Sequence, residues 1–414
     1  MNKELSSTHL ESDKIIKTIE DLIIWLEDQN LTSHDPYDVQ SSSVGKYFQK
    51  SKSNHLKNLL RKFLLILDKK YPKLLRFNSK KTKSATSSSL FASSCFLSYI
   101  INNDQKFLEK GIKELKWLEE NSSKGYSGYC WGLPFNWYLP EGIIADINTP
   151  CSTILIYMMD AFLLAYNLTN RKKYRDIAIS ISEFIKNDLN ENILDGNSIC
   201  LSYTPIDNLH VINVNSYAAS ILYAISFYTN DKIIIDYADK LINYVLNEQN
   251  ENGSWYYWGS QERITENIDS LHQCYIIENL YRCYLVNRNP KILSSIEKAL
   301  NFYINNFFSE GKITKFCDPK YARYPLELID HAEAIIMFSM IDKDFQTMKY
   351  ATKIMNFTLD KFKIPNKPYF YLYILNDKPI DIPYIRWGLS QILYAYAFYT
   401  LISKNSISFK NLLW

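Results

Sequence analysis

A repeating pair of helices is the feature that most constrains the fold of this chain. A segment that is apolar nearly all round is followed, after a short polar turn, by a segment with one charged face, and the pair recurs about every 60 residues. The apolar segments 153–166 and 215–228 show the helical spacing clearly. A helix that is apolar on all sides must be buried, whereas a helix with one polar face lies at a surface. The repeat therefore predicts an inner ring of helices wrapped by an outer ring.

The number of repeats favours a closed ring. Six apolar helices are expected, ending near Tyr99, Tyr166, Tyr228, Tyr284, Met340 and Tyr399. Stacked helical hairpins of this kind form either an open α-solenoid or a closed all-α (α/α)6 toroid. An open solenoid needs strongly polar terminal repeats, and none is evident here, so we predict the toroid. We expect it to span residues 81–414, with residues 1–80 as a helical extension packed on it.

Composition and motifs exclude several classes of protein. Among 414 residues, 47 Lys and Arg against 44 Asp and Glu leave a net charge of +3, too even for a polyanion-binding surface. The N-terminus has no leader pattern and no segment approaches the ~20 apolar residues of a membrane span, which predicts a cytoplasmic protein. Seven scattered cysteines without a Cys-x-x-Cys pair argue against a disulfide framework. Phosphate-binding, dinucleotide-binding and serine-nucleophile motifs are missing, so we expect no cofactor.

Polar residues at the starts of the inner helices predict a functional site. Inner helices of a toroid all run the same way, so their first turns gather at one mouth of the ring. Asp269 is expected to cap the helix that carries His272, and Asp330 the helix that carries His331 and Glu333. A carboxylate placed this way can orient an imidazole for acid/base catalysis. These five residues are our main catalytic candidates.

Two further segments offer polar side chains near the same mouth. The sequence Asp35-Pro-Tyr-Asp38 places two carboxylates before the helical body, Asp38 as a catalytic candidate and Asp35 as a binding candidate. The alternative for this motif is an Asx-type turn. His210, Asn213 and Asn215 lie at the start of an inner helix and are expected to bind substrate.

The last inner helix opens with Arg386 and Trp387, which we also expect to bind substrate. A guanidinium can hold a carboxylate or phosphate in bidentate fashion, and helix N-termini favour anions. The sequence therefore predicts an acidic ligand, such as a uronate-containing glycan or a nucleotide- or lipid-diphosphate sugar. The alternative is that Arg386 neutralises a buried carboxylate such as Asp269, Asp330 or Glu333.

Two loops between hairpins are unusually rich in aromatic residues and glycine, at positions 125–137 and 252–258. Such loops suit a rigid platform on which sugar rings stack. Aromatic plugs that fill the ring explain the same composition equally well. On the platform hypothesis, the side chains that line or border the pocket are Tyr129, Trp131, Trp137, Trp255 and Trp258.

At these motifs the chain resembles a family of bacterial proteins encoded in capsule and exopolysaccharide gene clusters, which is placed among the six-hairpin glycosidase-like toroids. The resembling stretches are 35–38, 128–137, 211–215, 253–257, 268–272, 330–333 and 385–387. Asn136 stands where many relatives have Asp, which puts an acid/base role at that position in doubt. The resemblance implies a toroid and a cytoplasmic enzyme of surface-polysaccharide biosynthesis. Its partners would be a saccharide or a nucleotide- or lipid-linked sugar, and other polysaccharide-assembly enzymes.

The reaction stays open on sequence alone. Related toroids hydrolyse glycosides with paired carboxylates, epimerise sugars with histidines, or cleave uronides, and this chain has carboxylates and histidines for each. A second hypothesis is a non-enzymatic glycan-binding or scaffold protein. A third is a zinc enzyme similar to lanthionine cyclases, using Cys130, Cys274 and histidines, although no tight ligand spacing supports a metal site.

Overall fold

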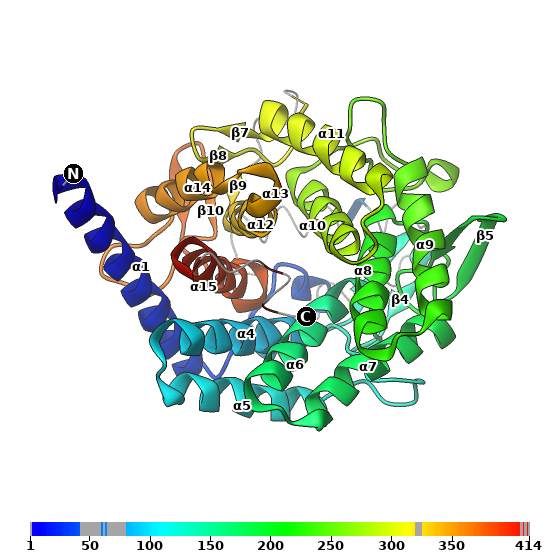
Figure 1. The fold of residues 1–414 in the computed structure, drawn as a ribbon, viewed down its shortest axis with the longest axis horizontal. Helices are drawn as coiled ribbons and strands as arrows, with labels where there is room; N and C mark the ends of the chain where they lie inside the picture. The colour runs from blue at the N-terminus through cyan, green and yellow to red at the C-terminus, as the bar shows by residue number, and fades with distance from the viewer. Residues whose placement is uncertain are drawn as a thin grey trace.

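The computed structural model describes residues 2–41, 59–60, 63, 80–318, 325–405, 409 and 412. Within these residues, six inner helices surround a common centre and a second layer of helices wraps them (Figure 1). The inner helices are α4 (Ala85–Asn102), α6 (Leu155–Thr169), α8 (Ile212–Thr229), α10 (Ser270–Asn287), α12 (Leu328–Met340) and α15 (Ser390–Asn405). The outer helices are α1 (Asn2–Asp28), α5 (Gln105–Glu120), α7 (Lys172–Asn187), α9 (Lys232–Asn247), α11 (Pro290–Phe307) and α14 (Met348–Lys361).

The ring is closed, which confirms the predicted (α/α)6 toroid. The first inner helix, α4, packs against the last, α15, and α1 packs beside α15 in the outer layer (Figure 1). The short α13 (Asp342–Phe345) joins α12 to α14. Most of the segment 42–79, within the predicted N-terminal extension, lies outside the described residues. The boundary at residue 80 therefore stays a prediction.

Burial explains why the two kinds of helix differ in sequence. In α8 every residue from Ile212 to Ser226 is buried, whereas α9 buries a single stripe that includes Ile234, Ala238 and Leu241. The inner helix α6 shows the same all-round burial. Together with the preceding short helix it forms the one described window, Ser152–Thr169, that is long and apolar enough to cross a membrane. The expectation that no segment comes near that length was wrong, but 72% of this window is buried in the ring.

Most turns from inner to outer helices share one backbone feature. The inner helices α4, α6, α8 and α10 each end on a residue with a left-handed backbone, and three of these four residues are asparagine, which tolerates positive φ better than most side chains. The four residues are Asn103, Asn170, Asn230 and Arg288. The following outer helix starts at once, capped in three cases by the side chain of Asp104, Asp231 or Asn289. Tight turns keep the helix pairs antiparallel, so the inner helices run in one direction.

Small antiparallel strands and short helices occupy the loops at the ends of the helices. The two-stranded pairs are β1 (Thr32–Ser33) with β2 (Thr82–Lys83), β3 (Trp137–Tyr138) with β4 (Ile144–Ala145), β5 (Glu191–Asp195) with β6 (Ser198–Leu201), and β7 (Phe308–Ser309) with β8 (Lys312–Ile313). A three-stranded sheet has the order β11 (Lys378–Ile380), β10 (Tyr373–Leu375), β9 (Leu326–Glu327). The short helices are η1 (Asp38–Ser41), η2 (Pro140–Gly142), η3 (Ser152–Ile154), η4 (Ser260–Glu262) and the π-helical turn η6 (Ile385–Leu389).

A buried ion pair crosses the centre of the ring. The guanidinium of Arg282 on α10 donates two hydrogen bonds to the carboxylate of Asp160 on α6, at 3.0 and 2.7 Å. These helices are separated by α8, so the pair joins inner helices that are not neighbours in the sequence of hairpins (Figure 1). The ring of Phe409 lies over the same guanidinium, 4.4 Å from its centroid. At this level the centre of the toroid therefore holds a buried ion pair covered by an aromatic ring.

Candidate functional site

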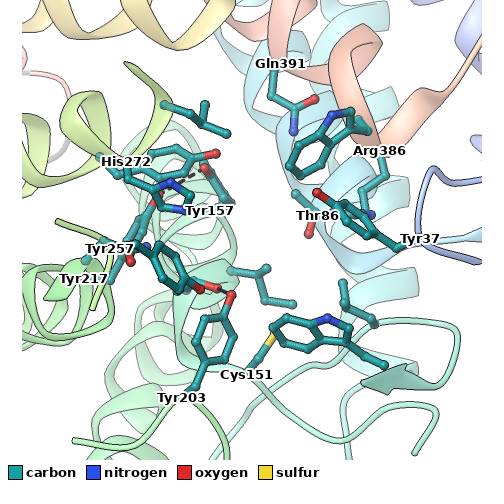
Figure 2. A pocket seen from close by; sticks show the side chains of 18 residues that line it. Tyr37, Thr86, Cys151, Tyr157, Tyr203, Tyr217, Tyr257, His272, Arg386 and Gln391 are labelled. Carbon is teal, nitrogen blue, oxygen red and sulfur yellow. Dashed lines mark hydrogen bonds between the residues drawn. The ribbon is translucent and has the colours of Figure 1, made fainter. Parts of the chain in front are cut away.

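A cavity of about 250 Å³ lies where the inner helices begin (Figure 2). Side chains from α4, α6, α8, α10 and the η6–α15 segment line it, so five of the six inner helices contribute. Of the residues selected from the sequence, the cavity brings together Trp137, Asn213, His272, Arg386 and Trp387. The remaining candidates lie elsewhere, and their positions are given below.

Three tyrosines from consecutive inner helices form one wall of this pocket. Tyr157, Tyr217 and Tyr275 come from α6, α8 and α10, and the hydroxyls of Tyr157 and Tyr217 are 3.4 Å apart. Burial raises the pKa of each tyrosine well above its ordinary value, so the hydroxyls stay protonated. Sequence reasoning missed all three. Each stands equally far before the left-handed residue that ends its helix, and this repeated position was the available signal.

More aromatic side chains complete the wall. The ring of Trp137 meets Tyr203 edge to face at 4.8 Å, and Tyr37 meets Trp387 in the same way at 5.3 Å. Sugar rings carry C–H groups that pack on aromatic faces and hydroxyls that need polar partners. Such a wall, with tyrosine hydroxyls at its edges, offers both.

His272 and Asp269 form an acid/base pair at the start of α10. The Asp269 carboxylate accepts a hydrogen bond from the backbone N–H of His272 at 3.0 Å, which confirms the predicted cap. The same carboxylate lies 2.7 and 2.8 Å from His272 Nδ1. Burial alone would raise the pKa of Asp269, but the imidazole and its hydrogen bonds outweigh burial and hold this pKa below its ordinary value. Since the carboxylate only accepts, Nδ1 carries the proton and a neutral His272 has Nε2 as its basic nitrogen.

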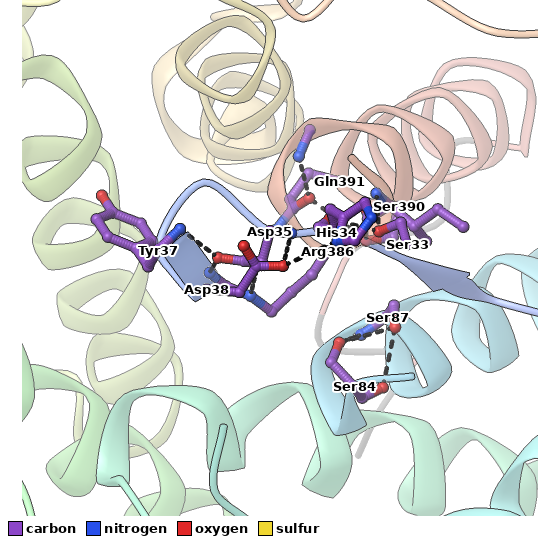
Figure 3. Close-up of polar contacts among 12 residues, drawn as sticks. Ser33, His34, Asp35, Tyr37, Asp38, Ser84, Ser87, Arg386, Ser390 and Gln391 are labelled. Carbon is purple, nitrogen blue, oxygen red and sulfur yellow. Dashed lines mark hydrogen bonds and ion pairs between the residues drawn. The ribbon is translucent and has the colours of Figure 1, made fainter. Parts of the chain in front are cut away.

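Arg386 lines the opposite side of the cavity and is paired with Asp35 (Figures 2 and 3). Nε and Nη2 of the guanidinium donate to the two carboxylate oxygens, the second at 2.8 Å. The sequence alternative of a buried ion pair is thus the observed one, with a carboxylate that was not foreseen as its partner. Arg386 and Asp35 are 9% and 3% exposed. Burial alone would lower the pKa of Arg386, but Asp35 more than offsets it, so this pKa is raised.

The Asp35–Asp38 motif builds the turn that places Tyr37 in the pocket (Figure 3). Asp35 Oδ1 accepts from the backbone N–H of Tyr37, and Asp38 Oδ2 accepts from the backbone N–H of Asp35, both at 2.9 Å. These are the contacts of an Asx-type turn. Asp38 does not line the cavity and lies 3.4 Å from His34 Nδ1, so the structure gives it a supporting place rather than the catalytic one we expected.

The candidates on α12 are buried beneath the pocket. The helix begins at Leu328, so Asp330 lies inside its first turn and does not cap it, contrary to our expectation. His331 Nδ1 bonds the carbonyl of Glu327 at 2.8 Å, and Nε2 accepts from the backbone N–H of Ile313 at 3.1 Å. Burial lowers the pKa of His331 to about 4, so the ring is neutral and both nitrogens are engaged. His331 is therefore structural, and its predicted catalytic role was wrong.

Glu333, one turn along the same helix, is 1% exposed and does not line the cavity. Burial, followed by the nearby charge of Asp330, raises the pKa of Glu333 to about 8. At neutral pH this side chain holds its proton. Neither Glu333 nor Asp330 lines the cavity.

The candidates at the start of α8 divide between the pocket and the framework. Asn213 lines the cavity, and its buried Oδ1 has no hydrogen-bond partner among the described residues. Asn215 instead ties the helix to β6, accepting from the backbone N–H of Leu201 at 2.7 Å and donating to the carbonyl of Val211 at 3.0 Å. His210 lies outside the cavity, with its backbone N–H bonded to Glu262 at 2.9 Å.

Each of the two aromatic loops buries one tryptophan against an outer helix. Trp131 and Trp255 are 1% and 0% exposed, and their indole N–H groups donate to the carbonyls of Leu118 and Val245 near the ends of α5 and α9, at 2.8 and 2.9 Å. Gly253 lets the second loop pass close to α11, because its φ is +92° and a Cβ there would lie 2.5 Å from a backbone oxygen of that helix. The expectation that both tryptophans border the pocket was wrong.

The other two aromatic candidates also lie outside the cavity. Trp258 is 8% exposed and packs in a small cluster with Leu209 and Val211. Tyr129 lies in a separate groove on the outside of the ring, beside Tyr174. Only Trp137, on strand β3, reaches the pocket among the five aromatic candidates.

Among the described residues, no aspartate or glutamate lines the cavity, and no group of three His, Cys, Asp or Glu side chains is close enough to hold a metal ion. Cys130 and Cys274, considered for zinc, are free and buried. The described residues therefore do not assemble the ligand set that a lanthionine-cyclase-like site needs.

The fold is shared with solved structures of carbohydrate-active proteins. A cellobiose 2-epimerase from Bacillus thermoamylovorans has a TM-score of 0.58 at 12% identity, covering 76% of this chain and 87% of that chain. A GH76 α-mannanase from Bacteroides thetaiotaomicron has 0.61 at 12%, covering 89% and 99%. An unsaturated glucuronyl hydrolase from Streptococcus agalactiae has 0.60 at 11%, covering 96% and 92%. No family model and no curated protein matches the sequence. The chain is thus similar to these toroids in fold.

Proposed function

We propose that this chain is a carbohydrate-active enzyme that transfers a proton at a carbon atom of a sugar, as an epimerase or a lyase does. The observation that carries the proposal is the placement of His272, backed by Asp269, across the pocket from Tyr37 and Arg386 (Figure 2). The fold of solved epimerases and hydrolases of saccharides supports it.

In this proposal His272 is the base. Its neutral Nε2 accepts a proton from a sugar carbon next to a carbonyl or carboxyl group, and Asp269 stabilises the imidazolium that forms. The electron pair of the broken C–H bond forms a C=C bond to the neighbouring carbonyl carbon. The carbonyl oxygen becomes an enolate oxygen, which the hydroxyl and guanidinium donors of the pocket can bond.

Tyr37 is the acid on the opposite wall. Burial raises its pKa more than the charges of Lys315 and Arg386 lower it, so its hydroxyl is protonated and can donate. Delivery of this proton to the opposite face of the same carbon gives an epimer and restores the carbonyl group. In a lyase the enolate electrons instead restore the carbonyl group and form a C=C bond to the next carbon. The C–O bond at that carbon breaks, the leaving glycosidic oxygen takes the proton of Tyr37, and an unsaturated sugar results. Afterwards the tyrosinate regains a proton from water and the imidazolium loses one to water.

Hydrolysis fits the pocket less well. Glycosidases of the common kinds need two carboxyl groups that flank the scissile bond, at roughly 5–10 Å from each other. No described carboxylate lines the cavity, because Asp35 and Asp269 are engaged behind Arg386 and His272. The chemistry available at the surface of the pocket is therefore that of an imidazole and tyrosine hydroxyls.

The biological setting we propose is a cytoplasmic step in the biosynthesis of a bacterial surface polysaccharide, acting together with other polysaccharide-assembly enzymes. The resemblance of the Asp35-Pro-Tyr-Asp38 and aromatic-loop motifs to proteins of capsule gene clusters supports this setting. The substrate in that setting would be a free saccharide or a nucleotide- or lipid-linked sugar.

Proton transfer at carbon can be followed directly. The protein is incubated in D₂O with a panel of oligosaccharides and nucleotide sugars, and the substrate C–H signals are followed by NMR. Loss of one C–H signal with a new epimer indicates an epimerase, and a new vinylic signal indicates a lyase. His272→Gln should abolish either change, whereas His210→Gln, outside the pocket, should leave it intact.

Two outcomes would contradict the proposal. Release of reducing sugars without deuterium at carbon would show a hydrolase. Binding of a saccharide by the wild-type protein with no change in any C–H signal would favour the non-enzymatic glycan-binding alternative.

A further inference from the structure

We infer that the pocket selects a neutral saccharide over an acidic one, and that Asp35 sets this selectivity by neutralising Arg386. The inference rests on the proposed function, because it concerns the ligand of the same site, and within that function it favours an epimerase of a neutral sugar over a lyase of a uronate. It reverses the prediction of an acidic ligand from the sequence, which assumed that Arg386 is available to bind an anion.

The charges of the pocket balance in pairs. Arg386 and His272 are the side chains lining the cavity, among the described residues, that can carry a positive charge. Asp35 pairs with Arg386 (Figure 3), and Asp269 pairs with His272. The two pairs leave no net positive charge for an anionic ligand.

The Asp35–Arg386 pair is too buried for an anion to replace Asp35 easily. Asp35 is 3% exposed. Its carboxylate accepts a hydrogen bond from the backbone N–H of Tyr37, and its own backbone N–H donates to Asp38 Oδ2. A ligand carboxylate that displaced it would leave a buried charge without a partner, and such a change typically costs several kcal/mol. A ligand carboxylate that did not displace it would lie near a second negative charge in a low-dielectric site.

The same pair still leaves hydrogen-bond donors for a neutral sugar. A guanidinium has five N–H donors, and Asp35 takes two of them. The faces of the guanidinium are covered by aromatic rings, with the Trp387 centroid at 5.3 Å and the Phe135 centroid at 5.7 Å. The guanidinium is therefore held as a fixed donor, which suits a hydroxyl or ring oxygen.

The rest of the lining is uncharged and can both donate and accept. Gln391 Oε1 accepts a hydrogen bond from the backbone N–H of Gly388 at 2.9 Å, and Figure 2 shows the amide nitrogen of Gln391 on the cavity side. Asn213 offers a buried Oδ1, and Thr86 a buried hydroxyl, neither bonded within the described residues. A sugar hydroxyl is a donor and an acceptor at once, so it can satisfy such a mixed set.

Calorimetry with two matched ligands tests the inference. The ligands are a neutral β-1,4-linked glucose disaccharide and the disaccharide of the same linkage in which one glucose is glucuronic acid. The wild-type protein should bind the neutral disaccharide at least tenfold more tightly. Asp35→Asn should shift the ratio of the two affinities toward the acidic disaccharide by tenfold or more, because Arg386 then carries an uncompensated charge. Glu310→Gln, which removes a surface partner of Lys353, should leave the ratio unchanged.

Asp35→Asn leaves a buried Arg386 without its counter-ion and can fail to fold, so the double variant Asp35→Asn with Arg386→Gln is measured as well. It lacks both charges and should keep the neutral preference. Tighter binding of the acidic disaccharide by the wild-type protein, or an Asp35→Asn protein with an unchanged ratio, overturns the inference but leaves the proposed reaction standing. Neutral preference without any C–H exchange supports the inference and removes the catalytic proposal. Absence of binding to both disaccharides overturns the inference, and the C–H exchange experiment then decides the proposed reaction by itself.

Discussion

The imidazole of His272 and the carboxylate of Asp269 are joined twice within one helix cap. The Asp269 carboxylate accepts the backbone N–H of His272 at 3.0 Å and lies 2.7 Å from its Nδ1. One carboxylate thus starts α10 and also orients the ring that faces the pocket. The local sequence Asp-x-x-His is sufficient for this geometry, because an N-cap side chain reaches the third residue of the helix.

Asp269 contacts His272 in two ways, once through the backbone N–H and once through the ring. We therefore expect a substitution of Asp269 to affect stability and activity differently. Asp269→Asn keeps a good N-cap residue, so the melting temperature should change little. The amide cannot stabilise the imidazolium as a carboxylate does, so kcat should fall by roughly 10²–10⁴-fold, the range of general acid/base contributions. Saccharide affinity measured by calorimetry should stay near that of the wild type. A large loss of melting temperature with a proportional loss of binding would show that Asp269 acts only as a structural cap.

The tryptophans of the two loops should behave differently on truncation. Trp255→Ala removes a fully buried plug and should cost about 3–5 kcal/mol of unfolding free energy. Trp137→Ala removes a half-buried ring from the pocket and should mainly weaken saccharide binding. Chemical denaturation and calorimetry on the two variants measure these effects. Equal losses of affinity in folded protein would contradict the division between plug and pocket wall.

Breaking the Asp160–Arg282 ion pair should destabilise the protein strongly, whereas replacing both residues should destabilise it little. Arg282→Met leaves Asp160 buried and unpaired, which should cost about 3–5 kcal/mol of unfolding free energy. Replacing both residues, with Asp160→Leu added, should recover most of that loss, since apolar pairs of similar volume often substitute for a buried ion pair. Urea unfolding of both variants provides the comparison. A double variant no more stable than the single one would mean that the lumen needs the charges for another reason.

The raised pKa of Glu333 predicts that its contribution to stability decreases as pH rises. Its pKa is about 8 in the folded chain, above the ordinary value of 4.5, so the folded state keeps a proton that the unfolded state has lost. The contribution of Glu333 to stability therefore falls as pH rises from about 4.5 to about 8, and is constant above that range. Glu333→Gln removes the titration and should raise the free energy of unfolding at pH 8 more than at pH 5. Parallel stability curves for variant and wild type between these pH values would contradict the raised pKa.

The sequence by itself determined the helical repeat, the inner and outer rings, and the Asp269–His272 cap. Each of these depends on residues within one or two helical turns, or on the contrast between all-round and one-sided apolar helices. Periodicity also showed that six inner helices begin at one mouth. It did not show which side chains of each first turn face the cavity, because that depends on how each helix is rotated in the closed ring.

Only the tertiary structure decided how the polar residues pair and which aromatics reach the pocket. Asp35 and Arg386 are 351 residues apart and meet because the ring closes, bringing the N-terminal turn against the last inner helix. Trp131 and Trp255 are buried against the end of a neighbouring outer helix, which offers each indole N–H a carbonyl acceptor. His331 is buried for the same kind of reason, since α14 and β8 cover the face of α12 that carries it. Local pattern predicts that a helix is present, but the packing of distant segments determines whether its polar side chains face the pocket or support the framework.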